Sequence, residues 1–363
     1  MPMHRLLYLP ALCQAFAPPR APQHYWHECS VQPVAPTVAR GREAHRATHR
    51  LGRVPEGRRR LGGRVQARTD AQLKRGIGEF YDESSGIWEE VWGEHMHHGY
   101  YREGEKPASF ARHVEAQDDM IEKALELCGA DGVAARCRRD GRRLRVLDVG
   151  CGVGGSSRYI ARKYGADVVG LTLSPKQAAR GNELSQGLNV TLKAEDATST
   201  AFADGSFDLV WSLESGEHMP DKPRFVEELA RLCAPGGAVS CVTWCHRDLE
   251  PDKRLGRVER AVLGAINYCY YLPKWCSGAD YRSLFGKQPG FASSKIVVED
   301  WTRNIAPFWP AVFRSALRWR SLRGLMRTGI RTARGAVAIL LMIVGYRIGT
   351  VKFVAVAANR EFS

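Results

Sequence analysis

Between residues 140 and 250, short apolar runs alternate with longer segments in which apolar and polar residues mix. Runs of this length, rich in valine and leucine, indicate buried strands rather than helices. The strands are expected at residues 144–149, 167–171, 190–193, 207–212 and 238–244. Helices are expected between them, and one begins after Ser174, a good N-cap residue, with Pro175 at its first position. Strands that alternate with helices predict a mostly parallel sheet with helices on both faces.

The segments on either side of this region have a different pattern. Residues 70–140 mix polar and aromatic positions and predict a helical, aromatic cap, whereas residues 247–345 are longer, aromatic and largely helical in pattern. An apolar run at 351–357 predicts a last strand, so residues 247–345 are expected to form a helical lid inserted between strands of the sheet. The longest apolar run, residues 336–344, is far below the roughly 18 residues of a membrane-spanning helix.

Composition changes sharply at about residue 69. The chain of 363 residues is 44% hydrophobic and 25% charged, as in ordinary globular proteins, and its net charge is +14. Residues 1–69 hold twelve arginines, no lysine and three acidic residues, and they show no helical or strand period. We interpret residues 1–69 as a disordered plastid-targeting presequence, in which a signal-peptide-like stretch precedes a transit peptide. A disordered basic tail is the alternative interpretation.

The ten cysteines do not form a metal-binding pattern. No CxxC occurs, and Cys241, Cys245 and His246 lie in an apolar, strand-like run, so we expect core thiols rather than a zinc site. We therefore expect no bound metal and reduced cysteines in a reducing compartment.

The strongest local signal is a glycine turn between the first strand and the following helix. Gly150, Gly152 and Gly154 are separated by single residues, and they enclose Cys151. A dinucleotide site would have the spacing G-x-G-x-x-G, with a pyrophosphate at the helix N-terminus. Asp148, two residues before the first glycine, would repel a pyrophosphate but suits an ammonium group. The pattern therefore favours S-adenosylmethionine, which carries an ammonium and a sulfonium and no phosphate, as the cofactor.

Two other strand ends supply candidate cofactor contacts. The second strand lacks the acid that usually grips ribose hydroxyls, and Thr172 and Gln177 are the expected polar partners there. Asp196, followed by Ala197, comes after the third strand, and its carboxylate could accept a hydrogen bond from the adenine amino group. A solvated loop acid is the alternative for Asp196.

Several longer stretches resemble one family. They are GEFYDESSGIWEEVWGEHMHHGYY at 78–101, FDLVWSLESGEHMPD at 207–221, TWCHRDL at 243–249, PKWCSGADY at 273–281 and EDWTRNIAPFWPAV at 299–312. With the glycine turn, they resemble the γ-tocopherol C-methyltransferase family over about residues 72–360.

The resemblance implies a Rossmann-like fold with a seven-stranded, mostly parallel sheet, in a methyltransferase domain over residues 70–363. It implies methyl transfer from S-adenosylmethionine to the chromanol ring of γ- and δ-tocopherol, and a plastid location. By resemblance to related enzymes, Tyr81 is expected to touch the methionine part of the cofactor. Trp88, Trp92, Tyr100 and Tyr101 could complete an aromatic wall or pack into the core.

Methylation of a ring carbon ortho to a phenol needs a base or strong hydrogen-bond acceptor at the hydroxyl, because a phenol pKa near 10 leaves little phenolate. Candidates follow the strands at their carboxyl ends, where such sheets bind ligands. We favour Glu217 and His246, and then His218; Glu217 and His218 could instead brace the following helix. The other candidates are Glu214, His95, His97 and His98.

A lipid acceptor implies a membrane surface. Residues 313–335 hold seven arginines and no acid, with recurring steps of three and four, as in a basic amphipathic helix. We expect a peripheral contact with a plastid membrane, and a solvated basic face is the alternative.

Two other functions compete with tocopherol methylation. One is an N-methyltransferase acting on an alkaloid-type amine, and the other is an RNA methyltransferase or basic binding protein. No nucleic-acid partner is expected, because most of the excess charge lies in residues 1–69.

Overall fold

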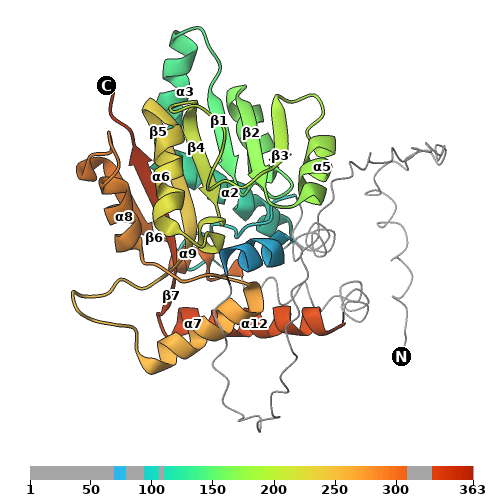
Figure 1. Cartoon of the computed structure of the whole chain (residues 1–363). Coiled ribbons are helices and arrows are strands. Elements are labelled where there is room, and N and C mark those ends of the chain that lie inside the picture. Colours follow the sequence, from blue (N-terminus) through green and yellow to red (C-terminus); the bar gives the residue numbers. More distant parts are fainter. Residues whose placement is uncertain (1–68, 79–93, 106–109, 309–328, 363) are drawn as a thin grey trace, which may run out of the picture. The chain divides into compact units, whose positions relative to one another are not determined.

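The computed structural model describes residues 69–78, 94–105, 110–308 and 329–362 (Figure 1). These residues belong to one compact unit, Val65–Ser363. The proposed presequence lies outside the described residues except for Thr69. Tyr81, Trp88 and Trp92 also lie outside them.

A seven-stranded sheet forms the centre of this unit, in the order β3-β2-β1-β4-β5-β7-β6. The strands are β1 Arg145–Val149, β2 Asp167–Thr172, β3 Val190–Ala194, β4 Phe207–Leu213, β5 Cys233–His246, β6 Ile296–Asp300 and β7 Val351–Asn359. β1 to β5 run parallel, and β7 is antiparallel to both of its neighbours. The predicted α/β class and mostly parallel sheet are confirmed. β5 begins earlier than predicted because Cys233 still pairs with Phe207 across a register shift.

Helices cover both faces of the sheet, as the alternating pattern predicted (Figure 1). On one face, α2, α3, α4 and α5 supply residues such as Met120, Val133, Ile160 and Ala178 to a single apolar core. On the other face, α6 and α8 supply a second core. The helices are α2 Phe110–Leu127, α3 Ala130–Arg139, α4 Gly155–Tyr164, α5 Pro175–Leu184, α6 Lys222–Leu232 and α8 Gly278–Gly286. Every residue of β4 is buried, as expected for a central parallel strand with helices on both sides.

The order of the strands fixes where a ligand can bind. The chain builds the sheet outward from β1 through β2 to β3, and then returns to place β4 on the other side of β1. Parallel sheets of this kind bind ligands at the carboxyl ends of the strands, where the order reverses. The glycine turn after β1 and the loop after β4 meet at that point.

The predicted lid, residues 247–345, is not one continuous insert. It contains α8 and β6, which belong to the sheet layers, and the short helices η2 Ser293–Lys295 and α9 Thr302–Ile305. Among the described residues of that range, α7 (Arg257–Tyr270) and α12 (Gly329–Arg347) form a separate layer, in which they pack against each other below the sheet in Figure 1. Aromatic and aliphatic residues of both helices share a third core with Tyr101, Phe308 and Val351.

Among the described residues, no helix combines the length and the apolar character needed to cross a bilayer. The eight cysteines in this part of the chain are free thiols. Most of the arginines in the basic stretch 313–335 lie outside the described residues.

Candidate functional site

The turn after β1 brings bare backbone to the edge of the sheet. Gly150, Gly152 and Gly154 have φ values of 76°, 55° and 79°, a left-handed conformation that favours glycine. A Cβ atom on Gly150 would lie 2.2 Å from Cβ of Ser215, in the loop after β4. The hydroxyl of Ser215 donates to the carbonyl oxygen of Val149 at 2.7 Å. Glycine is therefore required where the ends of β1 and β4 meet.

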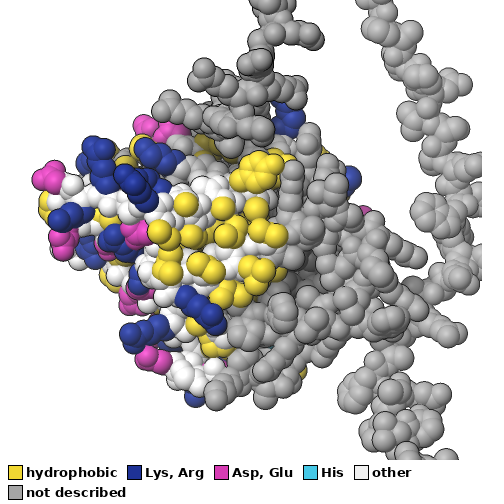
Figure 2. Space-filling model, turned by 90° about the horizontal axis from the view of Figure 1, so that it is seen from below, with side chains coloured by type: hydrophobic (Ala, Val, Ile, Leu, Met, Phe, Trp, Pro, Cys, Tyr) yellow, Lys and Arg dark blue, Asp and Glu magenta, His cyan; other side chains and the backbone are white. Residues whose placement is uncertain are grey.

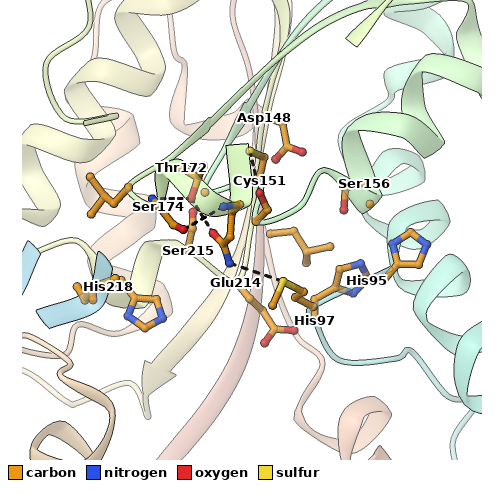
Figure 3. A pocket seen from close by; sticks show the side chains of 18 of the residues that line it. His95, His97, Asp148, Cys151, Ser156, Thr172, Ser174, Glu214, Ser215 and His218 are labelled. Atoms are coloured by element: carbon orange, nitrogen blue, oxygen red, sulfur yellow. Dashed lines mark hydrogen bonds between the residues drawn. The ribbon is translucent and has the colours of Figure 1, made fainter. Parts of the chain in front are cut away.

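A cavity of about 110 Å³ lies beside this turn (Figure 3). Its wall is made by the glycine turn, the end of β2, the loop after β4 and residues 94–97. The predicted cofactor residues Asp148, Gly150, Cys151, Gly152, Thr172 and Gln177 all line it, and so does His218. Gly154 is the N-cap of α4 and is not among the lining residues. The structure therefore brings most of the predicted cofactor residues to one place.

Asp148 provides a buried carboxyl group at the cavity wall. Only 2% of the residue is exposed, and Ser157 donates its hydroxyl hydrogen to Oδ2 of Asp148 at 2.6 Å. Burial raises the pKa of Asp148 to about 7, although the hydrogen bond from Ser157 opposes that shift. A cation bound beside this carboxyl would favour its charged form.

The end of β2 presents connected polar groups to the same cavity. Ser174 caps α5, because its hydroxyl oxygen accepts the backbone N–H of Gln177 at 3.1 Å. Thr172 donates its hydroxyl hydrogen to Oε1 of Gln177 at 2.7 Å. The amide nitrogen of Gln177 lies 3.7 Å from the sulfur of Met96 (Figure 3). The hydroxyl and amide that sequence analysis expected at this strand end therefore form one fixed pair.

Residues 94–98 pack against the glycine turn and the start of α4. Gln117 of α2 donates to the carbonyl oxygens of His95 and His97, at 2.7 and 2.9 Å. Glu94 forms an ion pair with the buried Arg158 of α4, at 2.9 Å. These contacts hold the segment so close that a Cβ atom on Gly152 would lie 3.3 Å from the sulfur of Met96.

Glu214 and His98 form a pair that the ranking from sequence underrated. The backbone N–H of His98 donates to Oε1 of Glu214 at 2.6 Å, and its Nδ1 lies 2.7 Å from Oε2. Glu214 lines the cavity, whereas the His98 side chain is 1% exposed and contacts the ring of Phe308, with 4.1 Å between centroids. Glu214 has a φ of 54°, a strained conformation for a residue with a side chain. Its place directly after β4 was the available sequence signal; its strain and its partner were not visible.

The favoured catalytic candidates occupy other places. Glu217, in the short helix η1 (Gly216–His218), does not line the cavity and accepts a hydrogen bond from Thr243 at 2.8 Å. Burial and then the nearby charge of Glu214 raise the pKa of Glu217 to about 8. His246 also lies off the cavity, with Nδ1 2.7 Å from the carbonyl oxygen of Arg247. His218 does line it, but removal from water and then the charge of Lys222 lower its pKa to about 3.

The remaining predicted residues lie away from the cavity or outside the described chain. Asp196 forms an ion pair with Lys74 in the helical residues 70–78, and Ala197 is buried in the core under α6. Neither residue lines the cavity in this conformation, so their contact with adenine stays a prediction. Tyr101 is fully buried and bonded to His113, and the ring of Tyr100 packs against Trp301. Both tyrosines therefore pack as core residues, and Tyr81 stays a prediction.

Comparisons with known proteins place this geometry in context. Residues 147–241 match the methyltransferase domain family. The probable chloroplastic tocopherol O-methyltransferase of Oryza sativa subsp. japonica is 50% identical, over 79% of this chain and 78% of the relative. The chloroplastic tocopherol O-methyltransferase of Arabidopsis thaliana is 47% identical, over 77% and 80%.

More distant proteins are similar to this chain in sequence or in fold. Norajmaline N-methyltransferase of Rauvolfia serpentina is 32% identical, over 80% of this chain and 99% of the relative. Among solved structures, a putative sarcosine dimethylglycine methyltransferase from Galdieria sulphuraria superposes with a TM-score of 0.64 at 23% identity, over 77% of this chain and 99% of that one. At that identity the likeness concerns the fold alone.

Proposed function

Because the chain belongs to the tocopherol methyltransferase family, we propose that it methylates a ring carbon of γ-tocopherol and δ-tocopherol, giving α- and β-tocopherol. The enzyme class and the methyl donor, S-adenosylmethionine, follow from the family and its methyltransferase domain. The acceptor, the carbon position and the products are the proposal. One observation carries it: a carboxyl held by a histidine, Glu214 with His98, lines the same cavity as the glycine turn.

The described residues fit the cofactor's polar groups. Asp148 would hold the ammonium group, the backbone at Gly150 and Gly152 would lie against the methionine part, and Thr172 with Gln177 would receive the ribose. When bound, the cofactor supplies an electrophilic methyl carbon, and the electron pair of the broken carbon–sulfur bond stays on sulfur. The cavity of about 110 Å³ is smaller than the roughly 300 Å³ of typical ligand pockets. We therefore expect Met96 and its neighbours to move when the cofactor binds.

Glu214 is the residue that we assign to the phenol. The ring carbon beside the phenol carbon forms the new bond with a pair of ring electrons, and it becomes more nucleophilic as the phenol proton is withdrawn. Glu214 would accept that proton. The hydrogen on the methylated carbon then leaves to water as a proton, which restores the aromatic ring, and the proton held by Glu214 returns to the phenol oxygen. His98 uses one lone pair on each oxygen of Glu214, so a further lone pair on each oxygen is left for a substrate.

The other candidates are poorly suited to accept the phenol proton or lie away from the cavity. A pKa of about 3 makes His218 a poor proton acceptor at neutral pH, although its imidazole could still position the ring. With a pKa of about 8, Glu217 is mostly protonated at neutral pH and cannot accept a proton. His246 would need a different acceptor pose, because it does not line the cavity. Glu214 thus replaces Glu217 and His246 as the favoured base.

We also propose that the protein works in a plastid, at the surface of a membrane. The support is the basic, acid-poor composition of residues 1–69 and the chloroplastic relatives. An acceptor with a long isoprenoid tail partitions into bilayers, so a peripheral contact is part of the same proposal.

The test incubates the full chain with S-adenosylmethionine carrying a ¹³C-labelled methyl group. The acceptors are γ-tocopherol, δ-tocopherol, an alkaloid-type amine and RNA, each in a separate reaction. We expect label in both chromanols, at a carbon shift typical of an aryl methyl group. An aryl methyl ether in the product would contradict carbon methylation, and label only in the amine or RNA would contradict the acceptor class.

A further inference from the structure

The outer side of α12 carries an exposed apolar stripe. Its members recur at steps of three and four residues, which places them on one side of the helix. They are Val337, Leu340 and Val344 on the helix and Ile348 in the turn directly after it, with exposed fractions of 49, 57, 43 and 46%. The opposite side of the helix is also apolar, and there Ala338 and Met342 are fully buried. A helix that is apolar all round normally has an apolar neighbour on every side.

α7 extends this stripe into a wider surface. α7 packs along α12, and Val258 and Tyr268 on it are 68% and 47% exposed. Figure 2, which views the protein from the side of these two helices, shows hydrophobic side chains gathered in one patch. We call this patch the α7–α12 face and define it by the four residues of the stripe together with Val258 and Tyr268. Continuous exposed apolar surface of this kind marks a site of interaction.

The charges on the two helices have one dominant sign. Their sequences hold five arginines, Arg257, Arg260, Arg331, Arg334 and Arg347. The only acid in them, Glu259, is bound to the guanidinium of Arg247 at 2.7 Å. Figure 2 shows Lys and Arg side chains, interspersed with Asp and Glu, around the apolar patch. An apolar centre with a basic edge complements the interface of an anionic bilayer.

The inner side of the same helices leads to the site. Leu263 of α7 and Met342 of α12 share a core with Phe308. Phe308 packs against the ring of His98, which holds Glu214 at the cavity wall. The helix layer, and behind it Phe308 and His98, therefore lie between the α7–α12 face and Glu214, the residue that we assign to the phenol.

We propose that the α7–α12 face docks on the surface of an anionic lipid bilayer, with α12 lying in the plane of the interface. The uninterrupted apolar run, Ala336 to Val344, is too short to span a bilayer but long enough for two turns of an interfacial helix. The choice of a bilayer rests on the proposed function, because a tocopherol-type acceptor reaches the enzyme from a membrane. A second copy of the chain is the competing occupant.

The test uses the full chain and flotation with vesicles of equimolar phosphatidylcholine and phosphatidylglycerol. The variants are Leu340→Asp and Val344→Asp. Val297→Asp in β6 is the matched control, because Val297 is 41% exposed, close to the 43% of Val344, and lies outside the face. Unchanged circular dichroism and S-adenosylhomocysteine affinity establish that each variant is folded.

We expect the unsubstituted protein and Val297→Asp to float with the vesicles. Leu340→Asp and Val344→Asp should each bind at least about tenfold more weakly, because each replaces a side chain that leaves water on docking. Equal flotation of all four proteins, or no flotation of the unsubstituted protein, would overturn the proposal. The unsubstituted protein could instead be a dimer that becomes monomeric in Val344→Asp while vesicle binding stays unchanged. That result would also overturn the proposal, because it would show that a second copy of the chain occupies the face.

Activity separates this proposal from the proposed function. With a chromanol that has a short, water-soluble side chain, both variants should keep the kcat of the unsubstituted protein. With γ-tocopherol in vesicles, their apparent KM should rise about tenfold. Vesicle binding that depends on the face, with no methylation of either chromanol, would leave the docking surface standing and contradict the function.

Discussion

The two ends of the cavity are assembled from the chain in different ways. At the end assigned to the cofactor, Asp148, the glycine turn, Thr172 and Gln177 come from thirty consecutive residues that form β1, α4, β2 and the start of α5. At the end assigned to the acceptor, Glu214 follows β4 and His98 comes from far upstream, while α7 and α12 share a core with Phe308, which contacts the ring of His98. A ligand site within one β-α-β unit can be recognised from spacing alone. A site shared by four distant segments depends on packing that spacing does not reveal.

The largest expected effect comes from removing the proposed base. Glu214→Gln keeps the shape of the side chain but removes its ability to accept the phenol proton, so kcat should fall about 10²- to 10⁴-fold. The affinity for S-adenosylhomocysteine, measured by calorimetry, should stay within about threefold.

Glu217→Gln is the matched control for Glu214→Gln, because both change a carboxyl to an amide and the two residues are neighbours in sequence. Its kcat at pH 7 should stay within about threefold, since the Glu217 carboxyl, with its pKa of about 8, is already mostly uncharged. The reverse ranking of the two variants would restore Glu217 as the base.

The next effect tests the other end of the cavity. Asp148→Asn should weaken S-adenosylhomocysteine binding about 10- to 100-fold, the usual cost of losing a hydrogen bond to a charged group. Asp196→Asn should have little effect if the ion pair with Lys74 persists in the complex. If Asp196→Asn weakens S-adenosylhomocysteine binding by a similar factor, the predicted contact of Asp196 with adenine forms in a rearranged, ligand-bound conformation.

A smaller effect concerns pH and the same carboxyl. The pKa of Asp148 is about 7, and an ammonium group binds the charged form, so raising the pH must strengthen binding. Between pH 6 and pH 7, the charged fraction rises from about 9% to 50%, which predicts about fivefold tighter binding of S-adenosylhomocysteine. Calorimetry at both pH values measures it. Asp148→Asn should show no such change, and a fivefold change that persists in this variant would assign the titration to another group.

The last prediction concerns the free energy of unfolding and its dependence on the ionisation of Glu217. Its folded pKa is about 8, above the ordinary 4.5, so between these pH values the unfolded chain releases a proton that the folded chain keeps. The free energy of unfolding should therefore fall as the pH rises from 4.5 to 8, by an amount that reaches a few kcal/mol. Glu217→Gln should lack this contribution in urea denaturation across that range. Parallel pH profiles for the two proteins would show that the carboxyl is not held neutral.

Sequence analysis placed the sheet well because its central strands are short apolar runs buried on both faces, as in β4. It also found the cofactor residues that lie within one β-α-β unit. Glu214 and Glu217 follow β4 and His246 ends β5, and the sequence alone does not show which of these side chains reaches the cavity. The contact of Glu214 with His98, 116 residues away, and its φ of 54° decided which carboxyl lines the cavity. The separate helical layer is smaller than the predicted lid, because the sequence pattern of α8 and β6 does not distinguish them from α7 and α12.

The central claim is that the cofactor and the phenol meet between the glycine turn and Glu214. A crystal structure with S-adenosylhomocysteine and a short-tailed analogue of γ-tocopherol tests it most directly. We expect the sulfur to lie beside Gly150 and Gly152, and the phenol oxygen to lie within about 3.2 Å of a carboxylate oxygen of Glu214. A phenol oxygen bonded to His246 or Glu217 instead, with Glu214 facing away from the ring, would contradict it.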